Sequence, residues 1–192
     1  MLVKKNLKKG ESELHFLPFM TDKNKDSVDI GANKGVFSYI LSKMSNKVYA
    51  FEPNPKSFKL LKSNLRYLSQ PAQCVNAAVS DFDGFANFYA DPDRLNDHEG
   101  YIDKNGKGDT PVTSLDSWQN QQIKSAFEKT IALKIDVEGQ EIPLLLGAQE
   151  MMKQADKVII LIEVHPEVLA RCKQTPDDLF AAAEQSRDFD WT

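Results

Sequence analysis

The stretch from Ser27 to Gly35, Ser-Val-Asp-Ile-Gly-Ala-Asn-Lys-Gly, constrains the fold more than any other part of the chain. Val28 and Ile30 predict a short buried strand that turns at Gly31, and a helix with a regular apolar stripe follows the turn. A strand, a glycine turn and a helix N-terminus together direct backbone N–H groups toward an anionic or polar ligand. The stretch therefore predicts a ligand-binding turn.

The next predicted strand, Lys47–Phe51, ends in Glu52. Glu52 follows Gly31 by about 20 residues, the spacing at which nucleoside-binding βαβ units place an acid for ribose hydroxyls. An ordinary turn with a surface glutamate remains the alternative on these features alone. The glycine pattern Gly31–Gly35 is GxxxG, whereas nicotinamide dinucleotides are bound by GxGxxG. A ligand with a ribose but no pyrophosphate fits better, which favours S-adenosylmethionine over a nicotinamide cofactor.

Strands and helices alternate along the rest of the chain, which predicts an α/β fold with a mostly parallel sheet and helices on both faces. The further strands are expected at Gln73–Ser80, Phe85–Ala90 (antiparallel), Ile131–Val137 and Lys157–Val164. The further helices are expected from Pro55, over Glu141–Lys153, and after a Thr175 cap to about Ser186. The apolar run at 157–164 predicts a strand buried on both faces. The polar stretch 91–109 predicts a long loop, of the kind in which acceptor choice resides.

Composition excludes several classes of protein. The 192 residues suit one domain, read as a lead-in over 1–26 and a single domain over 27–192. Lys and Arg number 24 against 28 Asp and Glu, and this net charge of −4 disfavours a nucleic-acid partner, RNA methylation included. No apolar run approaches the roughly 20 residues that cross a bilayer. Cys74 and Cys172 stand alone, as reduced thiols do in a cytoplasmic protein.

Acidic side chains follow the predicted strands where those strands end. Asp29 lies on the first strand, Asp136 and Glu138 follow the fourth, and Glu163 and His165 follow the fifth. Ligands of open α/β sheets bind outside these carboxyl ends, so we expect a site there. A salt-bridge network with helix caps is the alternative for the acids, and a structural histidine is the alternative for His165. No ligand spacing demands a metal ion.

Six stretches, in the same order, resemble the FkbM family of S-adenosylmethionine-dependent methyltransferases, and together they cover about residues 27–166. They are Val-Asp-Ile-Gly-Ala-Asn-Lys-Gly at 28–35, Phe-Glu-Pro at 51–53, Asn-Ala-Ala-Val-Ser-Asp at 76–81, Thr-Ser-Leu-Asp at 113–116, Leu-Lys-Ile-Asp-Val-Glu-Gly-Gln-Glu at 133–141 and Ile-Glu-Val-His-Pro at 162–166. The resemblance implies the class I methyltransferase (Rossmann-like) fold with strand order 3-2-1-4-5.

The resemblance also implies a residue set for each part of the cofactor. These are Asp29, Gly31, Ala32, Asn33 and Gly35 for the methionine end and the sugar, Glu52 for the ribose hydroxyls, Asn76, Ala77 and Asp81 near adenine, and Asp136 beside the reactive methyl group.

The sequence thus predicts O-methylation of a small-molecule or glycan hydroxyl, with Asp136, Glu163 and His165 as catalytic candidates. Histidine has an ordinary pKa of about 6.5, which suits a base near neutral pH. The family fold continues with an antiparallel hairpin after the fifth strand, and the short stretch after Pro166 is expected to lack it. A catalytically impaired cofactor-binding or partner module is therefore the alternative function. The unpaired edge of strand 157–164 predicts cover by the residues after Ser186, by a neighbouring chain in a homodimer, or by polypeptide beyond this sequence.

Overall fold

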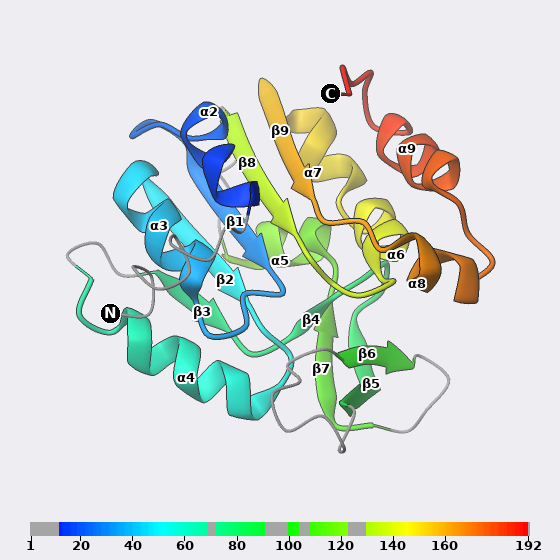
Figure 1. Ribbon diagram of the computed structural model, residues 1–192, viewed down its shortest axis with the longest axis horizontal. Coiled ribbons are helices and arrows are strands. Elements are labelled where there is room, and N and C mark those ends of the chain that lie inside the picture. Colours follow the sequence, from blue (N-terminus) through cyan, green and yellow to red (C-terminus); the bar gives the residue numbers. More distant parts are fainter. Residues whose placement is uncertain (1–11, 69–71, 91–99, 104–107, 123–129, 192) are drawn as a thin grey trace.

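The computed structural model describes residues 12–68, 72–90, 100–103, 108–122 and 130–191, and the statements below concern these residues. A five-stranded parallel sheet, sheet A, forms the centre of the molecule (Figure 1). Its order is β3-β2-β1-β8-β9, with strands β1 Asp26–Ile30, β2 Lys47–Phe51, β3 Gln73–Val75, β8 Thr130–Ile135 and β9 Lys157–Ile162. This confirms the predicted 3-2-1-4-5 order.

One face of sheet A is covered by α5 (Leu115–Gln122), α6 (Glu141–Leu146), α7 (Gln149–Gln154) and α9 (Pro176–Glu184). Trp118 of α5 contacts the rings of Tyr49 and Phe51 edge-on, with ring centroids 5.0 Å apart in both pairs. Every second residue of β1 and β2 points to this face, as the strand period requires.

The other face is covered by α3 (Val36–Met44) and α4 (Pro55–Leu65), with η1 (Ser12–His15) and α2 (Leu17–Met20) beside them. Leu14, Leu17 and Met20 are buried against the sheet, so the apolar part of the predicted lead-in packs on the core. A domain boundary at residue 27 stays a prediction.

The predicted third strand, Gln73–Ser80, is in fact two strands in different sheets. After β3 the side-chain amide of Asn76 donates to the backbone carbonyls of Glu52 (2.8 Å) and Pro53 (3.1 Å), and the chain leaves sheet A. It then forms β4 (Ala78–Val79) in a second sheet, sheet B.

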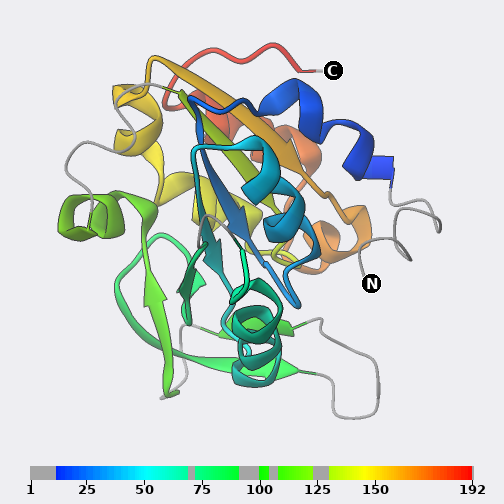
Figure 2. The same cartoon turned by 90° about the vertical axis from the view of Figure 1, so that its left-hand side faces the viewer.

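Sheet B has the order β4-β7-β5-β6, with β5 Gly84–Ala90, β6 Gly100–Asp103 and β7 Thr110–Thr113. The antiparallel strand expected at 85–90 therefore pairs with β6 and β7, and β6 lies within the stretch expected to be a loop. Residues 91–99 and 104–107 of that stretch lie outside the described part. In both ribbon views sheet B lies beyond the carboxyl ends of the sheet A strands (Figures 1 and 2).

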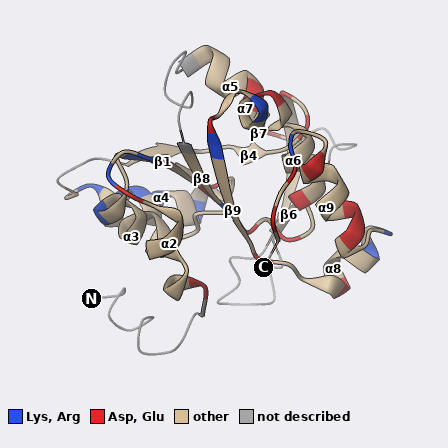
Figure 3. Ribbon diagram, turned by 90° about the horizontal axis from the view of Figure 1, so that it is seen from above, with Lys and Arg blue, Asp and Glu red and all other residues tan. Residues whose placement is uncertain are grey.

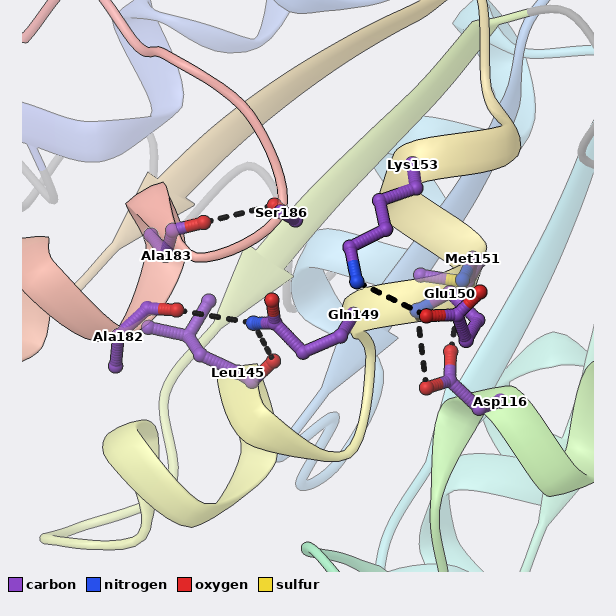
Figure 4. A network of polar contacts seen from close by, with 9 residues as sticks. All are labelled: Asp116, Leu145, Gln149, Glu150, Met151, Lys153, Ala182, Ala183 and Ser186. Atoms are coloured by element: carbon purple, nitrogen blue, oxygen red, sulfur yellow. Dashed lines mark hydrogen bonds and ion pairs between the residues drawn. The ribbon is translucent and has the colours of Figure 1, made fainter.

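The helix expected over Glu141–Lys153 is divided into α6 and α7 at Gly147. A side chain could not fit there, because a Cβ on Gly147 would lie 2.0 Å from the carbonyl oxygen of Ser80. Asp116 of α5 caps the second piece, since its carboxylate accepts the backbone N–H groups of Glu150 (3.1 Å) and Met151 (2.8 Å). Figure 4 shows this cap beside a second link, in which Gln149 donates to the carbonyls at 145 and 182. These bonds join α5, α6, α7 and α9.

Strand β9 is not buried on both faces as predicted. It ends at Ile162, lies at the edge of sheet A, and most of its side chains are half-buried. The residues from 187 to 191, which the structure describes, do not pair with it: Arg187 donates to the carbonyl of Ala155 (2.8 Å), and Phe189 packs against the core. The described residues contain no antiparallel hairpin after β9.

The remaining helix, α8 (Pro166–Arg171), was not predicted, whereas α9 begins at the predicted Thr175 capping box. Acidic residues gather along α8 and α9, and lysines gather near α3 and α4 (Figure 3). Within the described residues, no helix has both the length and the apolar character needed to cross a membrane.

Candidate active site

A cavity of about 370 Å³ lies at the carboxyl ends of the sheet A strands, with sheet B forming its opposite wall. Its lining comes from η1 and α3, from β4, β5 and β6, from the ends of β1 and β2, and from the loops after β1, β2, β3, β8 and β9. The lining residues are Glu13, Ile30, Gly31, Asn33, Phe37, Phe51, Glu52, Pro53, Ala77, Ala78, Val79, Phe88, Gly100, Ile102, Asp136, Val137, Glu138, Gln140, Glu163 and His165.

The turn after β1 packs directly against the backbone of the loop after β8. The N–H groups of Gly31 and Ala32 donate to the carbonyl of Phe51 (3.1 and 2.9 Å), and the N–H of Gly35 donates to Ala32 (2.8 Å). Gly31 has a φ of 78°, and a Cβ on it would lie 1.8 Å from the carbonyl oxygen of Asp136. Only glycine fits at this position, which leaves backbone rather than side chain facing the cavity.

Glu52 is the best-defined binding group of the site. It is buried, and its two carboxylate oxygens accept the backbone N–H groups of Asn33 and Asn54, each at 2.8 Å. Burial raises the pKa of Glu52 to about 7, with smaller contributions from the negative charges of Asp29 and Asp136, while the two hydrogen bonds oppose the rise. Each oxygen keeps a lone pair with which it can accept a ligand hydroxyl.

Asp29 lies beneath the turn and pairs in register with Lys134 of β8. It is fully buried, and Ser38 of α3 donates to its Oδ2. Burial raises the pKa of Asp29, and Lys134 opposes this rise. The ammonium group of Lys134 also lies 2.9 Å from Oδ2 of Asp136 and 4.5 Å from the centre of the Phe37 ring. The two acids hold the pKa of Lys134 above its usual value although burial lowers it. Lys134 thus ties the β1 turn to the β8 loop.

Three carboxylates from the loops after β8 and β9, those of Asp136, Glu138 and Glu163, gather near the imidazole of His165. Its Nε2 atom lies 3.6 Å from Oε1 of Glu138 and 3.5 Å from Oε1 of Glu163. Asp136, Glu138 and His165 each offer one ligand atom within 4.8 Å of the others. Burial raises the pKa of Glu163, as does the neighbouring Asp136, and Lys134 and His165 oppose them. The cluster can bind a polar acceptor, move a proton or hold a cation.

The structure brings only part of the predicted set into the cavity wall. Gly31, Asn33, Glu52, Ala77, Asp136, Glu163 and His165 line it. Asp29, Ala32, Gly35, Asn76 and Asp81 do not line it. Asn76 supports the lining residues Glu52 and Pro53 from behind, Asp29 accepts a hydrogen bond from Ser38 beneath the turn, and Asp81 is exposed on the rim of sheet B.

Several lining residues were absent from the prediction. Phe37 stands in the first turn of α3, and its place directly after the glycine turn is a signal that could have indicated it. Phe88 and Ile102 carry no such signal, because β5 and β6 meet the site only through the tertiary fold. Glu138 was expected at a strand end, and its left-handed backbone, with a φ of 50°, turns the chain at the cavity.

The arrangement of sheet A and its covering helices is that of the class I methyltransferase fold. A methyltransferase FkbM from Methylobacillus flagellatus shares this fold, with a TM-score of 0.54 and 16% identity over 87% of this chain and 38% of that one. A putative methyltransferase from Streptococcus mutans, solved in complex with SAH, has a TM-score of 0.50 and 14% identity over 84% of this chain and 74% of that one.

The family itself follows from the sequence. The model of the methyltransferase FkbM domain matches residues 29–181. This chain belongs to the FkbM family of S-adenosylmethionine-dependent methyltransferases. It is also 28% identical over 141 residues to the hexuronic acid methyltransferase AglP of Haloferax volcanii, which covers 73% of this chain. The chain spans 56% of the length of that relative.

Proposed function

We propose that this chain transfers the methyl group of S-adenosylmethionine to a hydroxyl oxygen of a glycan or small molecule. The observation that carries the proposal is one cavity lined by Glu52 after β2 and by Glu163 and His165 after β9. Gly31 and Asp136 lie between them, because they follow the adjacent central strands β1 and β8. The Glu52 end suits a nucleoside, and the His165 end suits a polar acceptor. A methyltransferase needs both in one enclosure, because the methyl group passes directly between its two substrates.

The residues at the Glu52 end would hold the cofactor. The carboxylate of Glu52 accepts the ribose hydroxyls, and the apolar walls formed by Pro53, Ala77 and Val79 take the adenine ring. Asn76 fixes the Glu52–Pro53 backbone through its two side-chain hydrogen bonds. The Gly31 turn and Asp136 would then hold the methionine end.

Methyl transfer is a single displacement at the methyl carbon. The acceptor oxygen forms a bond to that carbon while its bond to sulfur breaks, so that the sulfonium becomes the neutral thioether of S-adenosylhomocysteine. The acceptor proton passes to a carboxylate or imidazole of the cluster. Glu163 and His165 are the candidates, and their side chains lie 3.5 Å apart. Alignment of the two partners supplies about 7–11 kcal/mol, and a positioned base a factor of about 10²–10⁴.

The acceptor side of the cavity is polar, because Glu163 and His165 line it. Phe88, Gly100 and Ile102 form a wall of sheet B opposite the acids. The relative AglP is named as a hexuronic acid methyltransferase, so a glycan that carries a hexuronic acid is the first acceptor to test. Two further assignments stay predictions. A cytoplasmic location is predicted from the two thiols, and a homodimer is predicted from the position of β9 at the edge of sheet A.

The test is transfer of a labelled methyl group. The protein is incubated with S-adenosylmethionine carrying a deuterated methyl group and with oligosaccharides that contain or lack a hexuronic acid, and the products are read by mass spectrometry. The proposal predicts a deuterated methyl ether on the hexuronic acid glycan. Cofactor binding without transfer to any glycan or cell-extract acceptor would favour the alternative, a cofactor-binding module without catalytic activity.

A further inference from the structure

The cluster after β8 and β9 combines ligand types that protein metal sites combine. It offers two carboxylates, from Asp136 and Glu138, and one imidazole nitrogen, from His165, with the three ligand atoms within 4.8 Å of one another. Oxygen and nitrogen ligands of a first-row divalent ion lie about 2.0–2.2 Å from it, and so up to about 4.4 Å apart. Side-chain rotations that contract the cluster by a few tenths of an ångström would complete such a site.

A second observation comes from the histidine itself. The Nε2 atom of His165 is buried, although the residue as a whole is partly exposed, and it has no hydrogen-bond partner among the described residues. It faces two carboxylate oxygens, at 3.5 Å from Glu163 and 3.6 Å from Glu138, beyond ordinary hydrogen-bond length. A buried nitrogen without a hydrogen bond is costly, and a cation between this nitrogen and the carboxylates would give it a bonding partner.

The charge of the cavity gives a third reason. Glu13, Asp136, Glu138 and Glu163 all line it, and His165 is the one basic side chain among its described lining residues. Lys134 approaches Asp136 at Oδ2 from beneath the wall, which leaves the second oxygen of that carboxylate for another partner. An acceptor that carried a carboxylate, such as a hexuronic acid, would be repelled by this wall unless a cation stood between them.

From these observations we infer that Asp136, Glu138 and His165 bind a divalent transition-metal ion that receives the acceptor. The inference rests on the proposed function for the identity of the acceptor, and on the cluster alone for the ion. Three protein ligands leave coordination positions open, and the hydroxyl and carboxylate oxygens of an acceptor can fill them. The ion offsets the negative wall and lowers the pKa of the bound hydroxyl. Glu163, which is outside the ligand set, then takes the acceptor proton.

Manganese is the probe, because Mn²⁺ is paramagnetic and accepts mixed nitrogen and oxygen ligands. The chain is treated with a chelator, and Mn²⁺ is titrated while electron paramagnetic resonance follows the signal of the free ion. We expect one Mn²⁺ per chain and a nitrogen modulation of its spin echo from the imidazole. His165→Gln should remove the nitrogen modulation. Glu138→Gln should keep it and weaken binding by at least the roughly 10–100-fold that loss of an outer-shell partner costs.

The control is Asp177→Asn, which removes one negative charge from an exposed position on α9 outside the cluster. It should bind Mn²⁺ like the wild type, and thermal melting confirms that each variant is folded. Equal Mn²⁺ affinity in the wild type and both ligand variants, or no nitrogen modulation in the wild type, would overturn the inference. Calorimetry with S-adenosylhomocysteine in the presence of chelator separates the two proposals: binding there with no Mn²⁺ site refutes the ion alone, and no binding refutes the proposed function.

Discussion

Cofactor affinity should depend on pH through Glu52. Burial raises the pKa of this carboxyl to about 7 from an ordinary value of 4.5. The groups that face it are the acids Asp29 and Asp136, which raise the pKa, and the backbone N–H groups of Asn33 and Asn54, which lower it. Ribose hydroxyls donate to a carboxylate more strongly than to a carboxylic acid, so the cofactor binds the ionised form better. Affinity should therefore rise as pH rises through 7.

The size of the effect follows from the fraction of ionised carboxylate. With a pKa of about 7, roughly a tenth of Glu52 is ionised at pH 6 and roughly nine tenths at pH 8. If the ionised form alone binds, the dissociation constant for S-adenosylhomocysteine falls about tenfold between these pH values, or about 1.4 kcal/mol. Isothermal titration calorimetry across pH 6–8 measures this change directly.

The variant Glu52→Gln isolates the carboxyl. The backbone N–H groups of Asn33 and Asn54 donate to the carboxylate of Glu52, and a glutamine would present its own amide N–H to one of them. The variant should therefore bind S-adenosylhomocysteine more weakly at every pH and lose the tenfold pH dependence of its affinity. The matched control Glu167→Gln, at an exposed site in the first turn of α8, should keep it. An unchanged pH dependence in Glu52→Gln, or a constant affinity in the wild type, would refute the assignment of Glu52 to the ribose.

Four further outcomes are expected. The free energy of unfolding of the ligand-free chain should fall by up to about 3 kcal/mol as pH rises from about 4.5 to 7. The reason is that the raised pKa of Glu52 lets the folded chain bind more protons than the unfolded chain in that window; urea unfolding of the wild type and Glu52→Gln measures the difference. Gly31→Ala should abolish S-adenosylhomocysteine binding and cost at least about 1–3 kcal/mol of stability, since its Cβ would meet the carbonyl of Asp136; an unchanged melting temperature would contradict the close approach. Asp116→Ala should cost about 1–2 kcal/mol in urea unfolding through loss of the α7 cap, with cofactor affinity retained. Light scattering should report a dimer through the free edge of β9, and a monomer with slow hydrogen exchange along 157–162 would exclude it.

The parts of the fold that the sequence predicted are those set by local patterns. The strand, turn and helix around Gly31 and the strand that ends in Glu52 each have a short-range signature of apolar period and turn residues, and both lie where expected. The acids after β8 and β9 were predicted to share a site because parallel strands end at one edge, and the structure places Asp136, Glu163 and His165 in one cavity.

The parts that were missed depend on contacts between distant residues. The apolar pattern continues past Gly147, whereas the close approach of the Ser80 backbone, which requires a glycine there, arises only in the tertiary fold. Sheet B was missed because β4 has two residues and β6 lies in a polar stretch, so neither has a readable period. The left-handed turn that brings Glu138 beside His165 likewise has no signature in the composition of its segment.

One measurement tests the central claim most directly: calorimetric titration of the same protein sample with S-adenosylhomocysteine and with NADH. The GxxxG turn, the buried Glu52 and the cavity they share with Asp136 predict that one S-adenosylhomocysteine binds per chain and that NADH binds poorly. Tight binding of NADH together with no binding of S-adenosylhomocysteine would contradict the account of this site.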